Sequence, residues 1–168
     1  SKAKSGNVSR FCALPSPCVD LPKVDLTVDP WVLGYWLGNG DSDGARVTCG
    51  LSDRDEIVRL IQESGATVGA VSNTHGEAYR IGLRGQLDGL RSCGVLGNKH
   101  IPEQYLRSSA DQRWALLQGL VDADGHVDPR GGVEICLSSR VLAEGVFDLA
   151  VSLGLMPTRT SRTTRAFG

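Results

Sequence analysis

Two side chains that could bind a metal ion, Asn39 and Asp124, stand 85 residues apart (124 − 39) at the ends of two similar segments. The segments are VLGYWLGNG at 32–40 and LQGLVDADG at 117–125. Each pattern predicts a short apolar helix that ends at a left-handed glycine, which would place its last polar side chain at the rim of the buried structure. If the two helices pack as a pair, these side-chain oxygens converge and form a site for a hard cation such as Mg²⁺.

Small residues recur along both segments and indicate how the two helices could approach each other. The first segment contains Gly34 and Gly38, and the second contains Gly119 and Ala123. Small side chains on one helical face allow two backbones to come into close contact. We therefore expect Gly34, Gly38 and Gly119 to pack at a helix–helix interface.

The starts of both helices are also visible in the sequence. Asp29 followed by Pro30 fits an N-cap and a first helical position, which predicts a helix to about Gly38. The stretch SADQ at 109–112 fits a capping box and begins the second helix. The expected buried face of the second helix is apolar and consists of Trp114, Leu116, Leu117, Leu120 and Val121.

The same order of elements follows both glycine-terminated segments, which indicates an internal duplication. Hydrophobic periodicity predicts a strand and then a helix in each half, at 45–49 and 53–64 and again at 133–137 and 141–153. The first half continues with strands near 67–71 and 78–83 and a short helix near 86–93. The second half reaches only a strand after its helix, so it is shorter than the first.

These motifs resemble those of LAGLIDADG homing endonucleases of the intein-encoded, dodecapeptide type. The second segment matches the motif almost letter for letter, and the first resembles the WLGDG variant, with Asn39 where the family has aspartate. A third block, GNKHIPEQYL at 97–106, resembles the segment that precedes the second motif in intein endonucleases. Its Lys99 lies 25 residues before Asp124 (124 − 99), about where those enzymes have a catalytic lysine.

The resemblance implies an α+β fold with two pseudo-symmetric repeats, in which paired central helices support curved antiparallel sheets that form a DNA-binding saddle. Because both motifs lie in one polypeptide, we expect a monomer. The expected domains are a leader over 1–28, a first repeat with its connecting segment over 29–108, and a second repeat over 109–168 that is incomplete at its C-terminal end.

The implied activity is site-specific, Mg²⁺-dependent hydrolysis of both strands of a long asymmetric DNA target, with Mn²⁺ able to substitute. By resemblance, the ions are held by Asp124 with the carbonyl of Ala123 and by Asn39 with the carbonyl of Gly38. Lys99 would polarise the attacking water or offset charge on the phosphate.

The amide of Asn39 can coordinate Mg²⁺ but contributes no negative charge, so we expect weakened cleavage. The asparagine fits either a naturally decaying endonuclease or a deliberate change that keeps DNA bound and uncut. Asp41 and Asp43 could substitute in principle, but they follow Gly40 and should lie outside the helix axis. The alternative function is a cleavage-deficient, sequence-specific DNA-binding module derived from an intein endonuclease.

Residues for DNA contact are expected on the strand faces opposite the helices, where polar side chains can enter the major groove. The side chains with suitable alternation are Arg46, Thr48, Arg80, Glu134 and Ser138. Four further arginines are expected to hold phosphates, namely Arg84, Arg159, Arg162 and Arg165.

The overall charge opposes DNA binding, because 18 basic and 19 acidic residues give a net charge of −1. A local positive face can still neutralise phosphates, although a plain α/β domain without a nucleic-acid role stays open. No apolar run approaches the ~20 residues of a membrane span and no signal peptide is visible, which predicts an intracellular protein of the cytoplasm or nucleoid. Five cysteines without a CxxC pair argue against a disulfide framework and a zinc ribbon, and Cys49 and Cys136 are expected to be buried.

Overall fold

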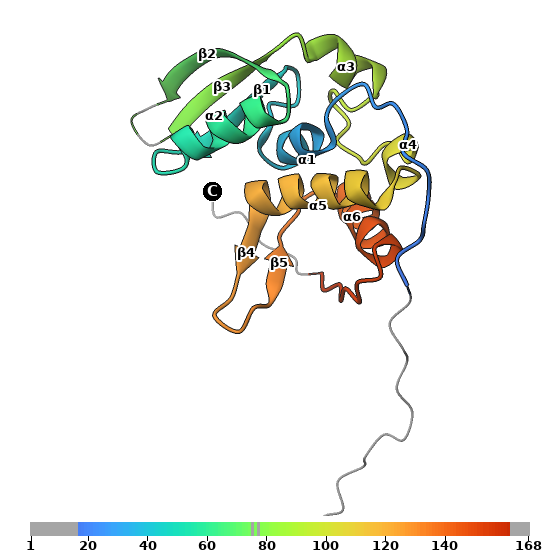
Figure 1. The fold of residues 1–168 in the computed structure, drawn as a ribbon. Coiled ribbons are helices and arrows are strands. Elements are labelled where there is room, and N and C mark those ends of the chain that lie inside the picture. The colour runs from blue at the N-terminus through green and yellow to red at the C-terminus, as the bar shows by residue number, and fades with distance from the viewer. Residues whose placement is uncertain (1–16, 75, 77, 162–168) are drawn as a thin grey trace, which may run out of the picture.

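The fold is organised around two helices that lie against each other, α1 (Pro30–Asn39) and α5 (Ala110–Asp124) (Figure 1). The computed structural model describes residues 17–74, 76 and 78–161. These two helices contact each other more extensively than any other pair of elements. The strands and the remaining helices are arranged on either side of this pair.

Helix α1 begins where the sequence predicts. The Asp29 carboxylate caps it by accepting hydrogen bonds from the backbone N–H groups of Trp31 (2.9 Å) and Val32 (3.2 Å), and Pro30 occupies the first turn. All residues from Trp31 to Leu37 are buried. A helix that is apolar on every side belongs in the core of a domain.

Helix α5 begins with the predicted capping box between Ser109 and Gln112. The Gln112 side chain also donates to the carbonyl of Val24 at 2.7 Å, which fixes the segment before α1 against α5. Tryptophan at 114 was expected in the buried face, but it is 44% exposed. The buried stripe instead consists of Arg113, Leu116, Leu117 and Leu120, which follow the i, i+3, i+4, i+7 spacing of one helical face.

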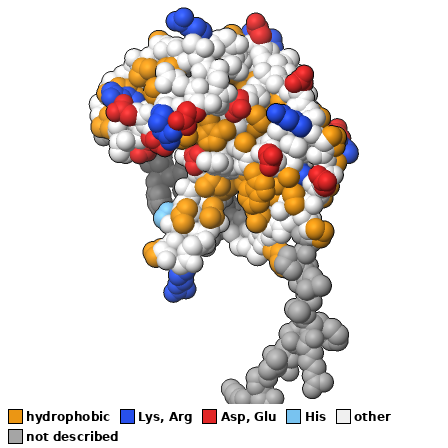
Figure 2. Space-filling view, viewed as in Figure 1, with side chains coloured by type: hydrophobic (Ala, Val, Ile, Leu, Met, Phe, Trp, Pro, Cys, Tyr) orange, Lys and Arg blue, Asp and Glu red, His pale blue; other side chains and the backbone are white. Residues whose placement is uncertain are grey.

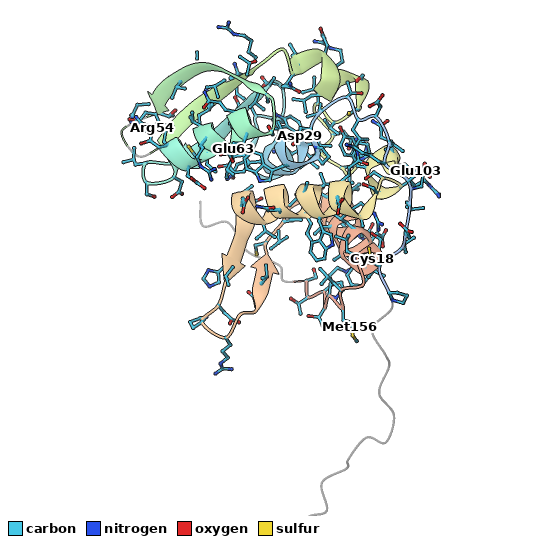
Figure 3. The ribbon with its side chains drawn as sticks, viewed as in Figure 1. Cys18, Asp29, Arg54, Glu63, Glu103 and Met156 are labelled. Carbon is cyan, nitrogen blue, oxygen red and sulfur yellow. The ribbon has the colours of Figure 1, made fainter. Side chains whose placement is uncertain are left out.

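Arg113 is a fully buried charged side chain without a carboxylate partner among the described residues. Its guanidinium donates to the carbonyl oxygens of Ser108 (2.9 Å), Ser152 (2.8 Å) and Val19. Cys18 lies in the same place, beside α6 (Arg140–Ser152) (Figure 3). Arg113 therefore ties the N-terminal segment and α6 to the central helix pair.

The first half forms a three-stranded antiparallel sheet with the order β1-β3-β2. Its strands are β1 (Arg46–Gly50), β2 (Thr67–Thr74) and β3 (Ala78–Arg84). Side chains on one face, including Val47, Ile81 and Leu83, are buried in the core that α1 and α2 (Arg54–Glu63) share. The short helix α3 (Leu87–Ser92) follows the sheet, so every element predicted for this half is present.

The second half contains α4 (Glu103–Leu106), α5, the two-stranded antiparallel sheet of β4 (Gly125–Val127) and β5 (Val133–Ile135), and α6. The sequence pattern did not predict β4, because three residues are too few to show an alternation.

Two expectations for this half are wrong. The predicted strand 133–137 ends at Ile135, so Cys136 is exposed rather than buried. No strand follows α6 within residues 153–161, the last part of the chain that the structure describes. A strand is stable only beside a partner, and the small β4–β5 sheet supplies little to pair with.

The glycines that end the two motif segments do not adopt the expected left-handed conformation. Gly40 has φ −85° and Gly125 has φ −81°, both extended. The backbone passes directly from each helix into strand pairing, since Gly40 bridges to Val47 and Gly125 begins β4. Glycine is required for space instead, because a Cβ at Gly40 would collide with the carbonyl and ring of Trp36.

The surface of the second half is more apolar than that of the first. Figure 2 shows hydrophobic side chains gathering over the middle and lower part of the molecule, where α5, α6 and the β4–β5 sheet lie. The large exposed apolar residues of this half are Trp114, Val127, Val133, Val141, Val151, Leu155 and Met156. The helices are thus less completely covered by a sheet than those of the first half.

The described residues confirm an α+β class with small antiparallel sheets. None of the described helices is both long and apolar enough to cross a membrane.

Candidate active site

The C-terminal ends of α1 and α5 meet at Asn39 and Asp124. The Asn39 side-chain Nδ2 donates to the carbonyl oxygen of Ala123 at 2.9 Å. A Cβ added to Gly38 would lie 2.5 Å from the Cβ of Ala123 and 3.2 Å from Oδ2 of Asp124. Side chains that are far apart in the sequence therefore share one small region of the molecule.

Backbone contact between the two helices fixes this convergence. A Cβ at Gly34 would overlap the carbonyl oxygen of Leu116, and a Cβ at Gly119 would overlap that of Trp31. The indole N–H of Trp31 donates to Oδ2 of Asp122 at 2.8 Å, which adds a polar contact across the same interface. Backbone contact therefore fixes how closely the two helices approach, and side-chain hydrogen bonds add to it.

Lys99 reaches the same place from the loop before α4. Its ammonium donates to the carbonyl oxygens of Gly38 (3.2 Å) and Gly40 (2.7 Å) and lies 5.1 Å from the centre of the Trp36 ring. Burial lowers the pKa of Lys99, while the carboxylates of Asp124 and Asp41 act in the opposite direction and raise it. A half-buried ammonium thus stands at the end of α1, beside Asp124.

Asp124 is itself partly buried, and desolvation raises the pKa of its carboxyl group. The neighbouring Lys99 opposes this effect and lowers that pKa. An added cation would offset the desolvation of this carboxylate, but it would also be repelled by the Lys99 ammonium.

This raised pKa predicts a pH dependence of stability. A folded state that holds a proton on Asp124 more tightly than the unfolded chain is favoured at low pH, and this contribution is lost as pH rises above 3.8 and through the folded pKa. Asp124→Asn has no titrating group at this position and should not show this loss of stability. As pH rises through this range, the free energy of unfolding of the variant should therefore increase relative to that of the wild type. Urea unfolding in a pH series checks the slope, and parallel curves for the two proteins would contradict the assignment.

Asp124 supplies the only carboxylate of the pair at 39 and 124, and Mg²⁺ commonly binds through one or two carboxylates and several waters. The carbonyl oxygen of Ala123 already accepts a hydrogen bond from the Asn39 amide, and that of Gly38 accepts one from the Lys99 ammonium. In the described part of the chain, no three His, Cys, Asp or Glu side chains cluster closely enough to hold a metal without help from other ligands.

Asp41 lies beside the site and belongs to an ion-pair network that the sequence did not reveal. Its Oδ2 lies 2.7 Å from Nε of Arg46 and 3.5 Å from Nε of Arg80. Asp41 follows the end of α1, as expected, but the chain turns back at once, and its backbone N–H donates to the carbonyl of Arg46 at 2.9 Å. The return of the chain along β1 brings Asp41 near enough to Lys99 to influence the pKa of that side chain.

Four of the residues expected to contact DNA lie on the face of the first sheet that is turned away from the core. Thr48 on β1 pairs with Arg80 on β3, and Arg46 pairs with Gly82, two residues before Arg84. Their neighbours in the alternation, Val47, Cys49, Ile81 and Leu83, are buried. The alternation therefore presents these polar side chains together on one open surface.

The other expected DNA contacts are not gathered in this way. Glu134 is exposed on β5, but Ser138 lies beyond the end of that strand. Nη1 of Arg159 lies 3.6 Å from Oε1 of Glu144 on α6, so this arginine faces an acidic side chain of the protein. Arg162 and Arg165 lie outside the described residues.

Comparison with known protein families finds a match to the C-terminal part of the chain. Residues 111–167 match the model of a LAGLIDADG-like domain, which supports membership of a LAGLIDADG endonuclease family. The match covers α5, the β4–β5 sheet and α6, and thus includes Ala123 and Asp124.

Individual relatives extend the similarity over most of the chain. A replicative DNA helicase DnaB of Mycobacterium intracellulare is 39% identical over 147 residues, which is 88% of this chain and 23% of the helicase. An iron–sulfur cluster assembly SufBD family protein of Mycobacterium leprae is 30% identical over 165 residues, 90% of this chain and 18% of that protein. A DNA polymerase of Thermococcus hydrothermalis is 38% identical over 64 residues, 38% of this chain and 4% of the polymerase. The chain thus spans less than a quarter of each relative.

Proposed function

We propose that this chain is the endonuclease part of an intein of the LAGLIDADG type, which binds duplex DNA at a specific site and hydrolyses it with a divalent cation. The names of its relatives, a helicase, an iron–sulfur assembly protein and a polymerase, share no single activity. A segment common to small parts of all three is therefore best explained as an inserted element and not as part of the activity of any of them.

The observation that carries the proposal is the meeting of Asn39, Ala123 and Lys99 at the ends of the paired helices. A cation bound there would neutralise the scissile phosphate and lower the pKa of a bound water. Asp124 would provide the negative charge that holds the cation. The Lys99 ammonium, fixed by two carbonyl oxygens, stabilises negative charge that develops on the phosphate.

The open face of the first sheet is the proposed DNA surface. Its arginines can contact guanine edges or phosphates, and Thr48 can contact a base between them. Under this proposal the β4–β5 sheet supplies the second, smaller part of a pseudo-symmetric saddle, and one chain covers an asymmetric target. Salt dependence of binding would report how many phosphates this surface contacts.

A second candidate function, sequence-specific DNA binding without cleavage, is favoured by one contact. The Asn39 amide donates to the Ala123 carbonyl, whereas an aspartate there could only accept and would leave that carbonyl free for a cation. A gel-shift assay beside a cleavage assay in Mg²⁺ separates the two functions, because the second predicts retained binding and intact DNA.

Asn39→Asp is expected to raise the rate of DNA cleavage by about 10-fold, since it adds a second carboxylate for the cation. It should also lower the free energy of unfolding without Mg²⁺ by about 1–3 kcal/mol, because the hydrogen bond to Ala123 is lost and two oxygens face each other. Added Mg²⁺ should restore that stability through binding to the folded state.

The matched control is Asn98→Asp, which makes the same charge change at an exposed position near Lys99. It should change neither the cleavage rate nor the response of stability to Mg²⁺. Equal cleavage and equal Mg²⁺ response for the Asn39 variant and the wild type would contradict the proposed role of position 39.

A further inference from the structure

We propose that Asp41 is a positioning residue that holds Arg46 and Arg80 in the orientation in which they read DNA bases. The inference rests on the proposed DNA-binding function. It assigns sequence selection to a carboxylate that faces two arginines from neighbouring strands.

The exposures of the three side chains support this role. The Asp41 side chain is only 18% exposed, whereas those of Arg46 and Arg80 are 47% and 45% exposed. The acid therefore lies in the surface, and each guanidinium extends further into solvent. Because one carboxylate oxygen contacts both arginines, it restricts the two of them together.

Asp41 is itself held in place by the backbone. Gly40 bridges to Val47, and the Asp41 N–H donates to the carbonyl of Arg46 at 2.9 Å. The carboxylate also lies near the Lys99 ammonium, whose pKa it raises. A group fixed from two sides can define the position of a long side chain that is otherwise free to rotate.

The atoms used in these contacts leave the base-reading atoms available. Both arginines approach Asp41 most closely through Nε. Nη2 of Arg46 also lies 3.5 Å from the exposed Asp43, so Arg46 must release that contact before it can present both Nη atoms to a base. Arginine reads guanine with a planar fork of two parallel donors, which requires a defined orientation. Fixing a rotamer-rich side chain before binding avoids an ordering cost of about 0.5–1.5 kcal/mol for each side chain.

The same carboxylate opposes phosphate binding, since it places a negative charge on the proposed DNA surface. Its removal should therefore have two opposite effects. Non-specific affinity rises because repulsion is lost, and selectivity falls because the arginines are no longer oriented. A residue with a merely structural role would not change the two in opposite directions.

The test compares Asp41→Asn with Asp43→Asn, which makes the same charge change two residues away. Asp43 is 83% exposed and contacts Arg46 only at 3.5 Å. The probe is random-sequence duplex DNA, from which the wild type first selects its preferred sequences. Affinity for the selected and the unselected duplex is then measured over a salt series for each protein.

Both variants should bind the unselected duplex about 2–5-fold more tightly at low salt, with the difference declining as salt rises. Of these two variants, Asp41→Asn alone should reduce the ratio of selected to unselected affinity, by about 10-fold for one lost bidentate contact. Asp41→Glu, which keeps the charge but moves the carboxylate, should reduce that ratio without the gain in non-specific affinity.

An unchanged ratio in a folded Asp41→Asn or Asp41→Glu protein would overturn the inference while leaving the proposed DNA binding intact. An equal loss of ratio in the Asp43 variant would also overturn it, because charge alone would then explain the effect. If the wild type retains no duplex at any salt concentration, the proposed function fails, and the inference fails with it.

Discussion

Gly119→Ala is expected to lower the free energy of unfolding by about 3 kcal/mol or more, although alanine is the better helix former. A Cβ at this position would overlap the backbone carbonyl of Trp31 and approach the backbone N of Tyr35 at 2.8 Å. Backbone atoms cannot rotate away, so α1 and α5 must move apart along their whole contact. Equilibrium urea unfolding measures the change.

The matched control for this variant is Gly145→Ala, the same substitution within helix α6. Its Cβ would meet side-chain atoms of Ile101 at 3.4 Å, an ordinary contact distance. This variant should be as stable as the wild type or more stable by up to ~1 kcal/mol. Equal stabilities for the Gly119 and Gly145 variants would mean that the two central helices do not touch as described.

Asp124→Asn is expected to reduce DNA cleavage at least ~10²–10³-fold while leaving DNA affinity nearly unchanged. The substitution removes the only carboxylate at the paired positions 39 and 124 and leaves the helix interface intact. Its neutral side chain also avoids the desolvation that raises the Asp124 pKa, so the fold should not be weakened at neutral pH. Cleavage of the duplexes selected by the wild type, followed with time in Mg²⁺, gives the rate.

Asp111→Asn provides the control for this second prediction, because Asp111 is exposed in the first turn of the same helix. It should cleave like the wild type. Undiminished cleavage by the Asp124 variant would show that the chemistry occurs elsewhere, and a parallel loss of DNA binding would show that Asp124 acts in binding and not in hydrolysis.

The sequence predicted the elements whose signals are local. Asp29 and the Ser109–Gln112 capping box act within one helical turn, so both central helices could be located to within one or two residues. The alternation in β1 also indicated correctly that Cys49 is buried. Such patterns are sufficient because the interactions that create them join near neighbours in the chain.

The sequence failed where distant parts of the chain determine the result. The apolar pattern placed Trp114 in the core, but its neighbour Arg113 is buried instead. This is possible because the carbonyl oxygens of Val19 and Ser152 accept hydrogen bonds from its guanidinium. Gly40 looked like a left-handed helix end, but pairing with the later strand β1 draws it into an extended conformation. No local pattern contains these partners.

In the candidate site, too, the sequence indicated some features and missed those that depend on distant parts of the chain. The duplicated motifs were enough to expect Asn39 and Asp124 in one place, and the family resemblance of the block at 97–106 added Lys99. The sequence did not indicate that the Asn39 amide would donate to Ala123 or that Lys99 would donate to Gly38, since both contacts depend on how α1, α5 and the intervening loop come together. The Asp41 network was missed for the same reason, because Arg80 enters it from β3.

We propose that the ends of α1 and α5 converge on a single cation site at Asp124, with Asn39 as its weaker partner. Crystals soaked in Mn²⁺ and measured for anomalous scattering test it most directly, because the peaks locate the ions independently of activity. We predict one strong peak at the Asp124 carboxylate, between the two helix ends, and a second peak beside position 39 only in the Asn39→Asp variant. Peaks confined to other parts of the molecule, or a pair of equal peaks in the wild type, would contradict this account.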